Sequence, residues 1–208
     1  MSQLLPIFPL QAVLFPDARL PLHIFEQRYK ILIAECIDQD SEFGINLFNN
    51  GTLHATGCTA VVDEIVKRYD DGRLDIIVEG KRRYHLEKTV ETTSPYYVGV
   101  VSFMFDREEK IDDLLRQKAI GLYNQMIRVA FKGRISEIDA ATERSKLLSF
   151  LMVQKSGFEL EQRQTFLSMQ SENERLAMLV RHLEAAVPLL SSEGKRKELI
   201  MNDGYLPN

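Results

Sequence analysis

The 208-residue sequence predicts an α+β protein with two domains: a partly closed β domain with one early helix over residues 1–105, and a carboxy-terminal helical bundle over residues 106–208. Three observations support this prediction. Short apolar and β-branched runs, separated by turn residues, fill most of the first half. A single helical pattern interrupts these runs near residue 30. After residue 105 the apolar residues recur at the 3.6-residue spacing of amphipathic helices.

The β domain begins with short extended segments and a helix. Residues 4–10 and 13–15 are apolar runs broken by prolines, which lack a backbone donor and favour the start or the edge of a strand. Phe25, Tyr29 and Ile33 then recur at helical spacing. We therefore expect two short extended pieces, followed by a helix from about residue 25 to residue 38.

The remainder of the β domain has the pattern of hairpins. Asn50-Gly51 and Asp71-Gly72 are strong turn signals, because glycine accepts the positive φ of a tight turn. The runs that flank these turns are rich in β-branched and aromatic residues, as strands are. The strands expected on this basis cover residues 42–48, 58–69, 73–79, 82–90 and 96–105.

The helical bundle is expected to begin where the composition changes, at Asp106. This aspartate precedes Glu109 by three residues, the spacing of a capping box at the start of a helix. The first helix should continue to Gly133, since glycine commonly ends helices. Its expected apolar stripe consists of Ile111, Leu115, Leu122, Met126 and Val129.

Three more helices are expected in the bundle. Two shorter ones cover residues 146–154 and 159–167. Ser171, with Glu174 three residues later, forms a second possible capping box and starts the last one. Pro188 should kink or end that helix, and the polar tail after it is expected to be ordered only through contacts.

The charge balance gives no net basic field that would attract nucleic acid irrespective of its sequence. The formal net charge is −4 and the isoelectric point is near 5.7. The acidity lies in the first 105 residues, which hold 10 Lys or Arg residues and 14 Asp or Glu residues. A local basic patch remains compatible with these values.

Cysteine usage and segment lengths favour a cytoplasmic protein that does not enter membranes. Cys36 and Cys58 lie far apart with no CxxC spacing, so neither a zinc site nor a disulfide framework is predicted. The first residues lack the basic segment of a secretory signal. The apolar runs are all shorter than a membrane-spanning helix requires.

Motifs of the common enzyme classes are missing from the sequence. It contains no glycine-rich loop of the P-loop type and no HExxH spacing, so ATP hydrolysis and metal catalysis have no support. Ser145 and Lys146 are adjacent, which on a helix places their side chains about 100° apart and argues against a catalytic pair. We expect a protein that is not an enzyme and has no cofactor.

Basic residues of the hairpin region provide one candidate binding surface. Lys81, Arg82 and Arg83, with Arg68 and Tyr84, could grip a phosphate backbone and stack on bases. The alternative is a solvated hairpin whose cations are balanced by neighbouring carboxylates. The net acidity of this half favours the second interpretation.

Aromatic residues provide the other candidate surface. Five of them are candidate contacts for an apolar polypeptide, and all five are equally suited to core packing: Phe25, Tyr29, Tyr97, Phe103 and Phe105. Because sequence alone does not separate these two roles, no residue is assigned to a binding site.

Segments in five regions of the chain carry a family resemblance. They are LPIFPL with VLFP (residues 5–10 and 13–16), LPLHIFE with RY (20–26 and 28–29), FGI (43–45), the hairpin from residue 57 to Gly80 with Arg83, and the helical LSFL, QTFL and RL (148–151, 164–167 and 175–176). In this order and spacing, the chain resembles the amino-terminal, substrate-recognising domain of Lon proteases over nearly its whole length.

This resemblance implies a PUA-like β domain followed by a helical bundle, without the ATPase and peptidase domains that follow in Lon. It further implies a stand-alone, non-catalytic module that binds unfolded or extended polypeptide segments in a groove between the two domains. A protease would then act in trans. The alternative function is a PUA-like nucleic-acid-binding protein, because fold alone does not fix the ligand. The oligomeric state and the identity of the partner stay open.

Overall fold

A computed structural model describes residues 2–139 and 148–191. Its residues up to Phe105 form one compact unit, here called the β unit, and those from Asp106 form a second, the helical unit. Ser145, Lys146, the expected start of the second bundle helix and the polar tail from residue 192 lie outside the described part.

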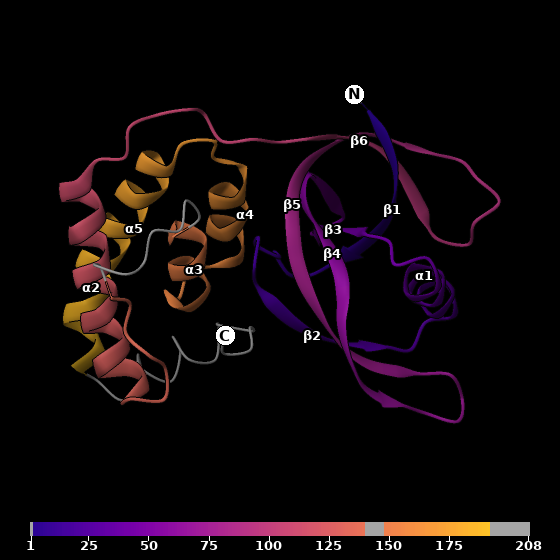
Figure 1. Cartoon of the computed structure of the whole chain (residues 1–208), viewed down its shortest axis with the longest axis horizontal. Coiled ribbons are helices and arrows are strands. Elements are labelled where there is room, and N and C mark those ends of the chain that lie inside the picture. Colours follow the sequence, from indigo (N-terminus) through magenta and orange to yellow (C-terminus); the bar gives the residue numbers. More distant parts are fainter. Residues whose placement is uncertain (1, 140–147, 192–208) are drawn as a thin grey trace. The chain divides into compact units, whose positions relative to one another are not determined.

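Five of the six strands of the β unit close into a barrel, and β2 lies outside the ring (Figure 1). The strand order is β2-β5-β4-β3-β1-β6, and β6 also pairs with β5, which completes the ring. Helix α1 (Gln27–Asp38) covers the predicted early helix except for its first two residues. The strands are β1 (Gln3–Leu10), β2 (Arg19–Ile24), β3 (Phe43–Asn49), β4 (Thr52–Arg68), β5 (Leu74–Val90) and β6 (Tyr97–Phe103).

Strand β1 contains two prolines although it has a neighbour on each side. Its first part, with Pro6, pairs with β6, and its last part, with Pro9, pairs with β3. The two paired stretches overlap at Ile7. Each proline thus lies where the strand is bonded on one side only, which agrees with the expected preference of proline for strand edges.

The prediction of a second extended piece at residues 13–15 was wrong. These residues form a loop, and their three apolar side chains are buried in the core. Backbone hydrogen bonds of 2.9 Å hold the loop against β5, from Gly80 N to Ala18 O and from Asp17 N to Gly80 O. The second strand is β2, which the sequence analysis missed because Pro21 interrupts its apolar pattern.

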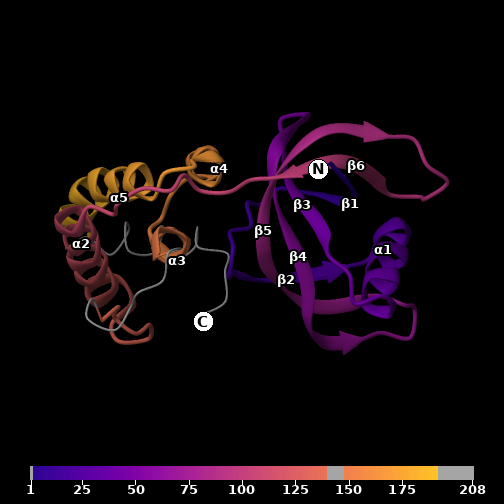
Figure 2. The same ribbon diagram turned by 45° about the horizontal axis from the view of Figure 1, so that its top comes forward.

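The predicted hairpin turns are confirmed. Asn50 and Gly51 have φ values of 50° and 77°, the left-handed pair that a two-residue hairpin turn requires. Gly72, with φ of 79°, closes the turn between β4 and β5, which run side by side past α1 (Figure 2). The runs expected at residues 73–79 and 82–90 are one continuous strand, β5, because Gly80 continues the ladder between them.

Tyr84 occupies the interior of the β unit and explains two glycines around it. Its side chain is 0% exposed and its hydroxyl donates to Asn46 Oδ1. A methyl group on Gly44 or Gly57 would lie 2.7 or 2.6 Å from Tyr84 Cζ, well inside van der Waals contact. The ring packs with Leu5, Ile7, Leu86 and Val101. Glycine is therefore required at these two positions because a side chain would collide with the ring. The requirement does not come from φ, which is not positive at either glycine.

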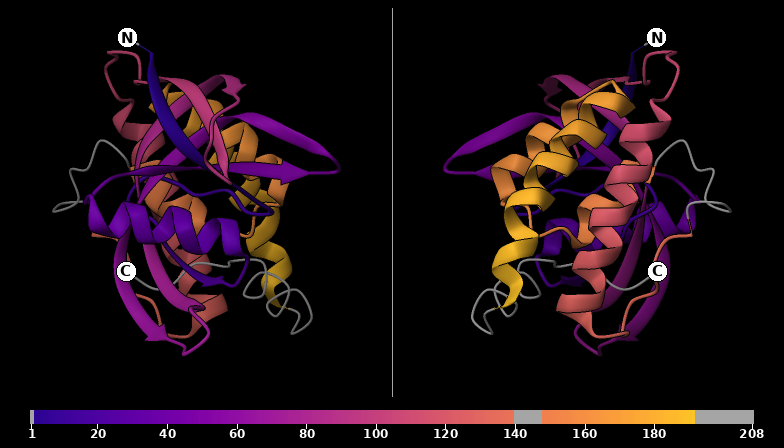
Figure 3. Two further views of the ribbon diagram at one scale, coloured as in Figure 1. Left: turned by 90° about the vertical axis from the view of Figure 1, so that its right-hand side faces the viewer. Right: turned by 90° about the vertical axis from the view of Figure 1, so that its left-hand side faces the viewer.

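Among its described residues, the helical unit contains four α-helices, the last of which is followed by a 3-10 turn. Helices α2 and α5 pack side by side, and Figure 3 shows this pair in its right-hand view and α1 against the strands in its left-hand view. None of the helices in the described ranges is long and apolar enough to cross a membrane. The elements are α2 (Asp113–Phe131), α3 (Leu148–Lys155), α4 (Leu160–Ser168), α5 (Glu172–Ala186) and η1 (Val187–Ser191).

The ends of the helices follow the sequence signals except at the start of α2. Gly133, with φ of 80°, follows the last turn of α2, and α5 ends just before Pro188, as predicted. The N-cap of α2 is Asp112, whose carboxylate accepts from the backbone of the first turn, and the prediction of a start at Asp106 was wrong.

The predicted apolar stripe of α2 was also partly wrong. Met126 is buried, but the other members of the stripe, such as Leu122 and Val129, are only partly covered. The buried face is rotated by about one residue and includes Ile120, Tyr123 and Ile127. Helical spacing alone does not distinguish two apolar stripes that lie next to each other.

Candidate functional site

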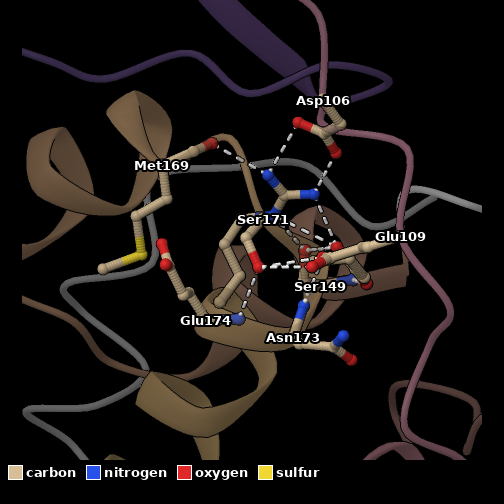
Figure 4. Close-up of polar contacts among 9 residues, drawn as sticks. Asp106, Glu109, Ser149, Met169, Ser171, Asn173 and Glu174 are labelled. Atoms are coloured by element: carbon tan, nitrogen blue, oxygen red, sulfur yellow. Dashed lines mark hydrogen bonds and ion pairs between the residues drawn. The ribbon is translucent and has the colours of Figure 1, made fainter.

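A buried network of charges joins the start of the helical unit to α5 (Figure 4). Arg175 is 0% exposed and its guanidinium binds Asp106 through both terminal nitrogens. It also donates to Glu172 Oε2 at 2.6 Å and to Met169 O at 2.9 Å. Asp106 therefore neutralises an arginine 69 positions away instead of capping α2.

The same network shows no features of a nucleophilic site. Ser149 Oγ donates to Glu172 Oε2 at 2.6 Å and accepts from Arg175 Nε at 2.8 Å. Burial raises the pKa of Glu172, while Ser149 and Arg175 oppose that rise. Because Ser149 is fully buried, a substrate cannot reach its hydroxyl. We interpret this cluster as structural.

Glu109 caps α5 rather than α2. Its carboxylate accepts from Ser171 Oγ at 2.8 Å and from Asn173 N at 3.1 Å, while Ser171 Oγ accepts from Glu174 N. The backbone donor of Asn173 and the Ser171 hydroxyl hold the pKa of Glu109 below its usual range. The cap predicted at Ser171 is present, but the carboxylate that completes it comes from residue 109.

The five candidate aromatic residues separate into two groups. Tyr29 is buried against Phe8, with ring centroids 4.0 Å apart, and Phe103 packs against the Tyr84 cluster. The other three are exposed, by 59% for Phe25, 50% for Tyr97 and 76% for Phe105. The groove expected between the two domains stays a prediction.

Phe25 belongs to a small polar and aromatic cluster near the turn of the β4–β5 hairpin. Its ring stacks on His23 at 5.9 Å, and His23 Nδ1 lies 2.5 Å from Asp75 Oδ1. Tyr69 donates to the other oxygen of Asp75 at 2.7 Å. These hydrogen bonds lower the pKa of Asp75. The exposed Phe25 ring therefore stacks on an imidazole that is bonded to a carboxylate.

The candidate nucleic-acid residues do not form a basic, stacking surface. Tyr84 and Arg83 are buried, so neither ring nor guanidinium is available to a base. Lys81 pairs with Glu79 at 2.6 Å, and Arg82 pairs with Glu42 at 2.9 Å while covering the Phe103 ring. Arg68 pairs in register with Leu74, eight residues before Arg82 on β5, which is on the order of 25 Å along the strand.

A pocket of about 330 Å³ lies in the β unit between the end of α1 and the middle of β4. We call it the α1–β4 pocket. Its lining residues are Cys36, Ile37, Asp40, Ser41, Val61, Val62, Asp63, Glu64 and Ile65. Both aliphatic and acidic residues line it. Sequence analysis did not identify this site.

The charge of the α1–β4 pocket is negative. Asp40, Asp63 and Glu64 contribute three carboxylates, whereas Arg19 pairs with Asp63 at 2.6 Å and lies 3.6 Å from Glu64. The last turn of α1 contains no basic residue, so the partial negative charge of the helix carboxyl end adds to theirs.

Cysteine chemistry and metal binding find no support in the geometry. Both thiols are free and buried, and burial raises the pKa of Cys36 and Cys58. Across residues 2–139 and 148–191, no group of three His, Cys, Asp or Glu side chains is placed to hold a metal ion.

Residues 4–185, which reach into both units, match the model of the substrate-binding domain of ATP-dependent protease La (LON). The chain belongs to this family, and the predicted family is confirmed. Lon protease of Parabacteroides distasonis is 32% identical over 117 residues, which make up 52% of this chain. The match spans only 14% of the length of that curated relative.

Two solved structures show the same fold. The Lon N-terminal domain protein of Xanthomonas campestris superposes with a TM-score of 0.67 at 24% identity, covering 86% of this chain and 98% of that one. The N-terminal domain of Mycobacterium avium complex Lon protease gives a TM-score of 0.63 at 14% identity, covering 88% and 98%. These matches confirm the predicted α+β class.

Proposed function

We propose that this chain is a non-catalytic module that binds unfolded or extended segments of other polypeptides. The observation that carries the proposal is the match of residues 4–185 to a protease substrate-binding domain. In Lon such a domain is one part of a larger protein. For this chain, the proposal places the protease on a separate polypeptide, to which the bound segment is passed, and keeps the cytoplasmic location expected from the sequence.

The geometry of the β unit supports a binding role more than a chemical one. Phe25 and Tyr97 expose large apolar surfaces, and the α1–β4 pocket borders a strand. An extended polypeptide offers apolar side chains and unpaired backbone groups, which such features can receive. The buried Ser149 and the two buried thiols offer no accessible nucleophile.

Fluorescence anisotropy tests this proposal directly. The probe is a labelled protein chain, reduced and carboxymethylated so that it cannot refold, titrated with the purified protein at low and at high salt. We expect saturable binding that survives high salt, because burial of apolar surface does not depend on counterion release. In a separate assay, the purified protein is incubated with casein, with and without ATP. We expect no casein fragments.

A labelled single-stranded RNA provides the parallel probe. Binding of RNA alone, with a steep loss at high salt, would overturn the proposal in favour of a nucleic-acid-binding protein. A double variant, Lys81→Glu with Arg82→Glu, should leave polypeptide binding intact, since both cations are already paired with carboxylates.

A further inference from the structure

One half of strand β4 has an open edge. β4 is 17 residues long whereas β3 is 7, and β3 pairs with β4 only as far as Ala60. From residue 61 to residue 68, β4 pairs with β5 on one side. On the other side, no strand of the described part of the chain pairs with it. We call these residues the β4 edge. Unpaired backbone donors and acceptors on such an edge can bond an added strand.

The α1–β4 pocket lies beside this edge. Five of its lining residues, Val61 to Ile65, belong to the β4 edge, and the rest come from the last turn of α1 and the residues after it. Its volume falls at the lower end of the range of roughly 300–1,000 Å³ for ligand sites in proteins. A side chain of an added strand therefore has a place to enter.

Strand β2 also has an open edge, which is less suited to receiving a strand. β2 pairs only with β5, and Pro21 in its centre has no backbone donor. On the β4 edge the protection is of another kind, with register shifts after Val62 and after Ile65 and charged side chains at Asp63 and Glu64. The register shifts and charged side chains disfavour pairing with most strands, so a strand that binds here has to complement the local charge.

Charge complementarity then indicates which segment fits. The lining includes three acidic residues, Asp40, Asp63 and Glu64, and Arg19 lies within ion-pair distance of the last two. It also includes three aliphatic residues, Ile37, Val61 and Ile65. A lysine or arginine side chain satisfies both features, because its aliphatic stem packs on apolar atoms while its charged end meets carboxylates.

We propose that an extended polypeptide segment adds to the β4 edge as a further strand and inserts a Lys or Arg side chain into the α1–β4 pocket. This inference rests on the proposed function and specifies its site and its selectivity. The occupant is a segment of another protein in which basic and apolar residues alternate. Main-chain hydrogen bonds contribute affinity, and the pocket selects the side chain.

The first test separates main-chain from side-chain recognition. The probe is a labelled peptide of alternating lysine and valine. It is compared with two methylated versions, one N-methylated at every lysine and the other N-methylated at every valine. Strand addition predicts that one methylated version binds about tenfold more weakly or worse, while the other is little changed, because only one set of N–H groups faces the edge. Equal affinity of all three would overturn strand addition.

The second test concerns charge. Asp40→Lys and Glu64→Lys should each weaken binding of the lysine–valine peptide and strengthen binding of a glutamate–valine peptide. This change in preference should shrink at high salt. The matched control is Glu91→Lys, an exposed carboxylate after the far end of β5, which should behave as the parent does. Unchanged preference in both pocket variants would overturn the assignment of the site.

Hydrogen exchange locates the bound segment and distinguishes the two proposals. We expect the peptide to slow amide exchange at residues 61–66 of the β4 edge. If the unfolded chain binds but these amides are unaffected, the inference fails and the proposed function stands. If neither the unfolded chain nor the peptides bind, the proposed function itself fails. Concentration-dependent dimerisation that Glu64→Lys abolishes would assign the edge to a second copy and overturn the proposal.

Discussion

Tyr84 and Arg175 are both fully buried, yet the two units accommodate them in different ways. In the β unit, Tyr84 is neutral and has one polar partner, Asn46, while glycines leave space for its ring. In the helical unit, Arg175 is charged and binds two carboxylates, a serine and a backbone carbonyl. The first interior depends mainly on shape and the second on charge.

The two interiors should therefore fail in different ways. Removing one partner of a buried ion pair leaves a charge without compensation, which costs more than the pair contributes. Removing a neutral hydroxyl costs less, because the group left behind is uncharged. The helical unit should thus respond to charge and pH, whereas the β unit should respond to volume.

The largest expected effect is that of Arg175→Met. It leaves Glu172 and Asp106 without their cation and should lower the free energy of unfolding by roughly 3–5 kcal/mol. Urea unfolding followed by circular dichroism in the helical band measures this change. Arg181→Met, on an exposed position of α5, is the matched control and should change stability by less than about 0.5 kcal/mol. Equal losses of stability in both variants would contradict the stabilising role of the buried network.

The next largest effect concerns Gly44. In Gly44→Ala the new methyl group would overlap the Tyr84 ring and Leu5, and we expect a loss of roughly 3 kcal/mol in the β unit. Gly121→Ala in α2 meets no atom within 4 Å and should instead stabilise by about 0.5–1 kcal/mol. Thermal unfolding measures both, and a neutral Gly44→Ala would contradict the packing argument.

A smaller effect is expected for Tyr84→Phe. Only the hydroxyl is lost, which leaves Asn46 Oδ1 without this donor, and the cost should be about 1–2 kcal/mol. Denaturant unfolding of the parent and the variant gives the difference. A loss of stability as large as that of Arg175→Met would contradict the expectation that a buried charge costs more to disrupt than a buried neutral hydroxyl.

The smallest effect is the pH dependence carried by Glu109. Because its pKa is lowered in the folded protein, its stabilising contribution is complete above the unfolded value near 4.3 and is lost as pH falls through the folded value. The melting temperature of Glu109→Gln should therefore fall less than that of the parent between about pH 6 and pH 3. Glu108→Gln, an exposed neighbour, should follow the parent, and identical profiles for all three proteins would contradict the capping role.

Local signals in the sequence were enough to predict most elements of this fold. Asn50-Gly51 and Gly72 determine their turns through backbone angles that few other residues adopt, and Ser171 caps its own helix. The prediction that Asp106 and Glu109 cap α2 was wrong because capping rules consider only neighbours, whereas these carboxylates bind residues more than 60 positions away. Residues 13–15 were predicted to be an extended piece because a buried loop has the same apolar composition.

The candidate site was harder to predict, for a physical reason. The pocket joins the end of α1 to β4 residues 61–65, and no periodicity links segments that come together only in the fold. One signal was present in the sequence. The run at residues 58–69 is longer than the strand before it, so that strand could not pair with its whole length. Which aromatic residues are exposed could not be read from periodicity, because Phe25 and Tyr29 share one helical spacing and yet Phe25 is exposed while Tyr29 is buried.

The anchoring of residues 106–112 to α5 determines where this chain can be cut into fragments. Arg107 N donates to Gln170 O, and Asn173 binds the backbone of Lys110 and Asp112, so this segment belongs to the helical unit although it contains no helix. A recombinant fragment designed from helix boundaries, beginning at Asp113, would retain every helix and still expose the buried guanidinium. A fragment that begins at Asp106 retains the acidic partner and is the better starting point for crystallisation or resonance assignment.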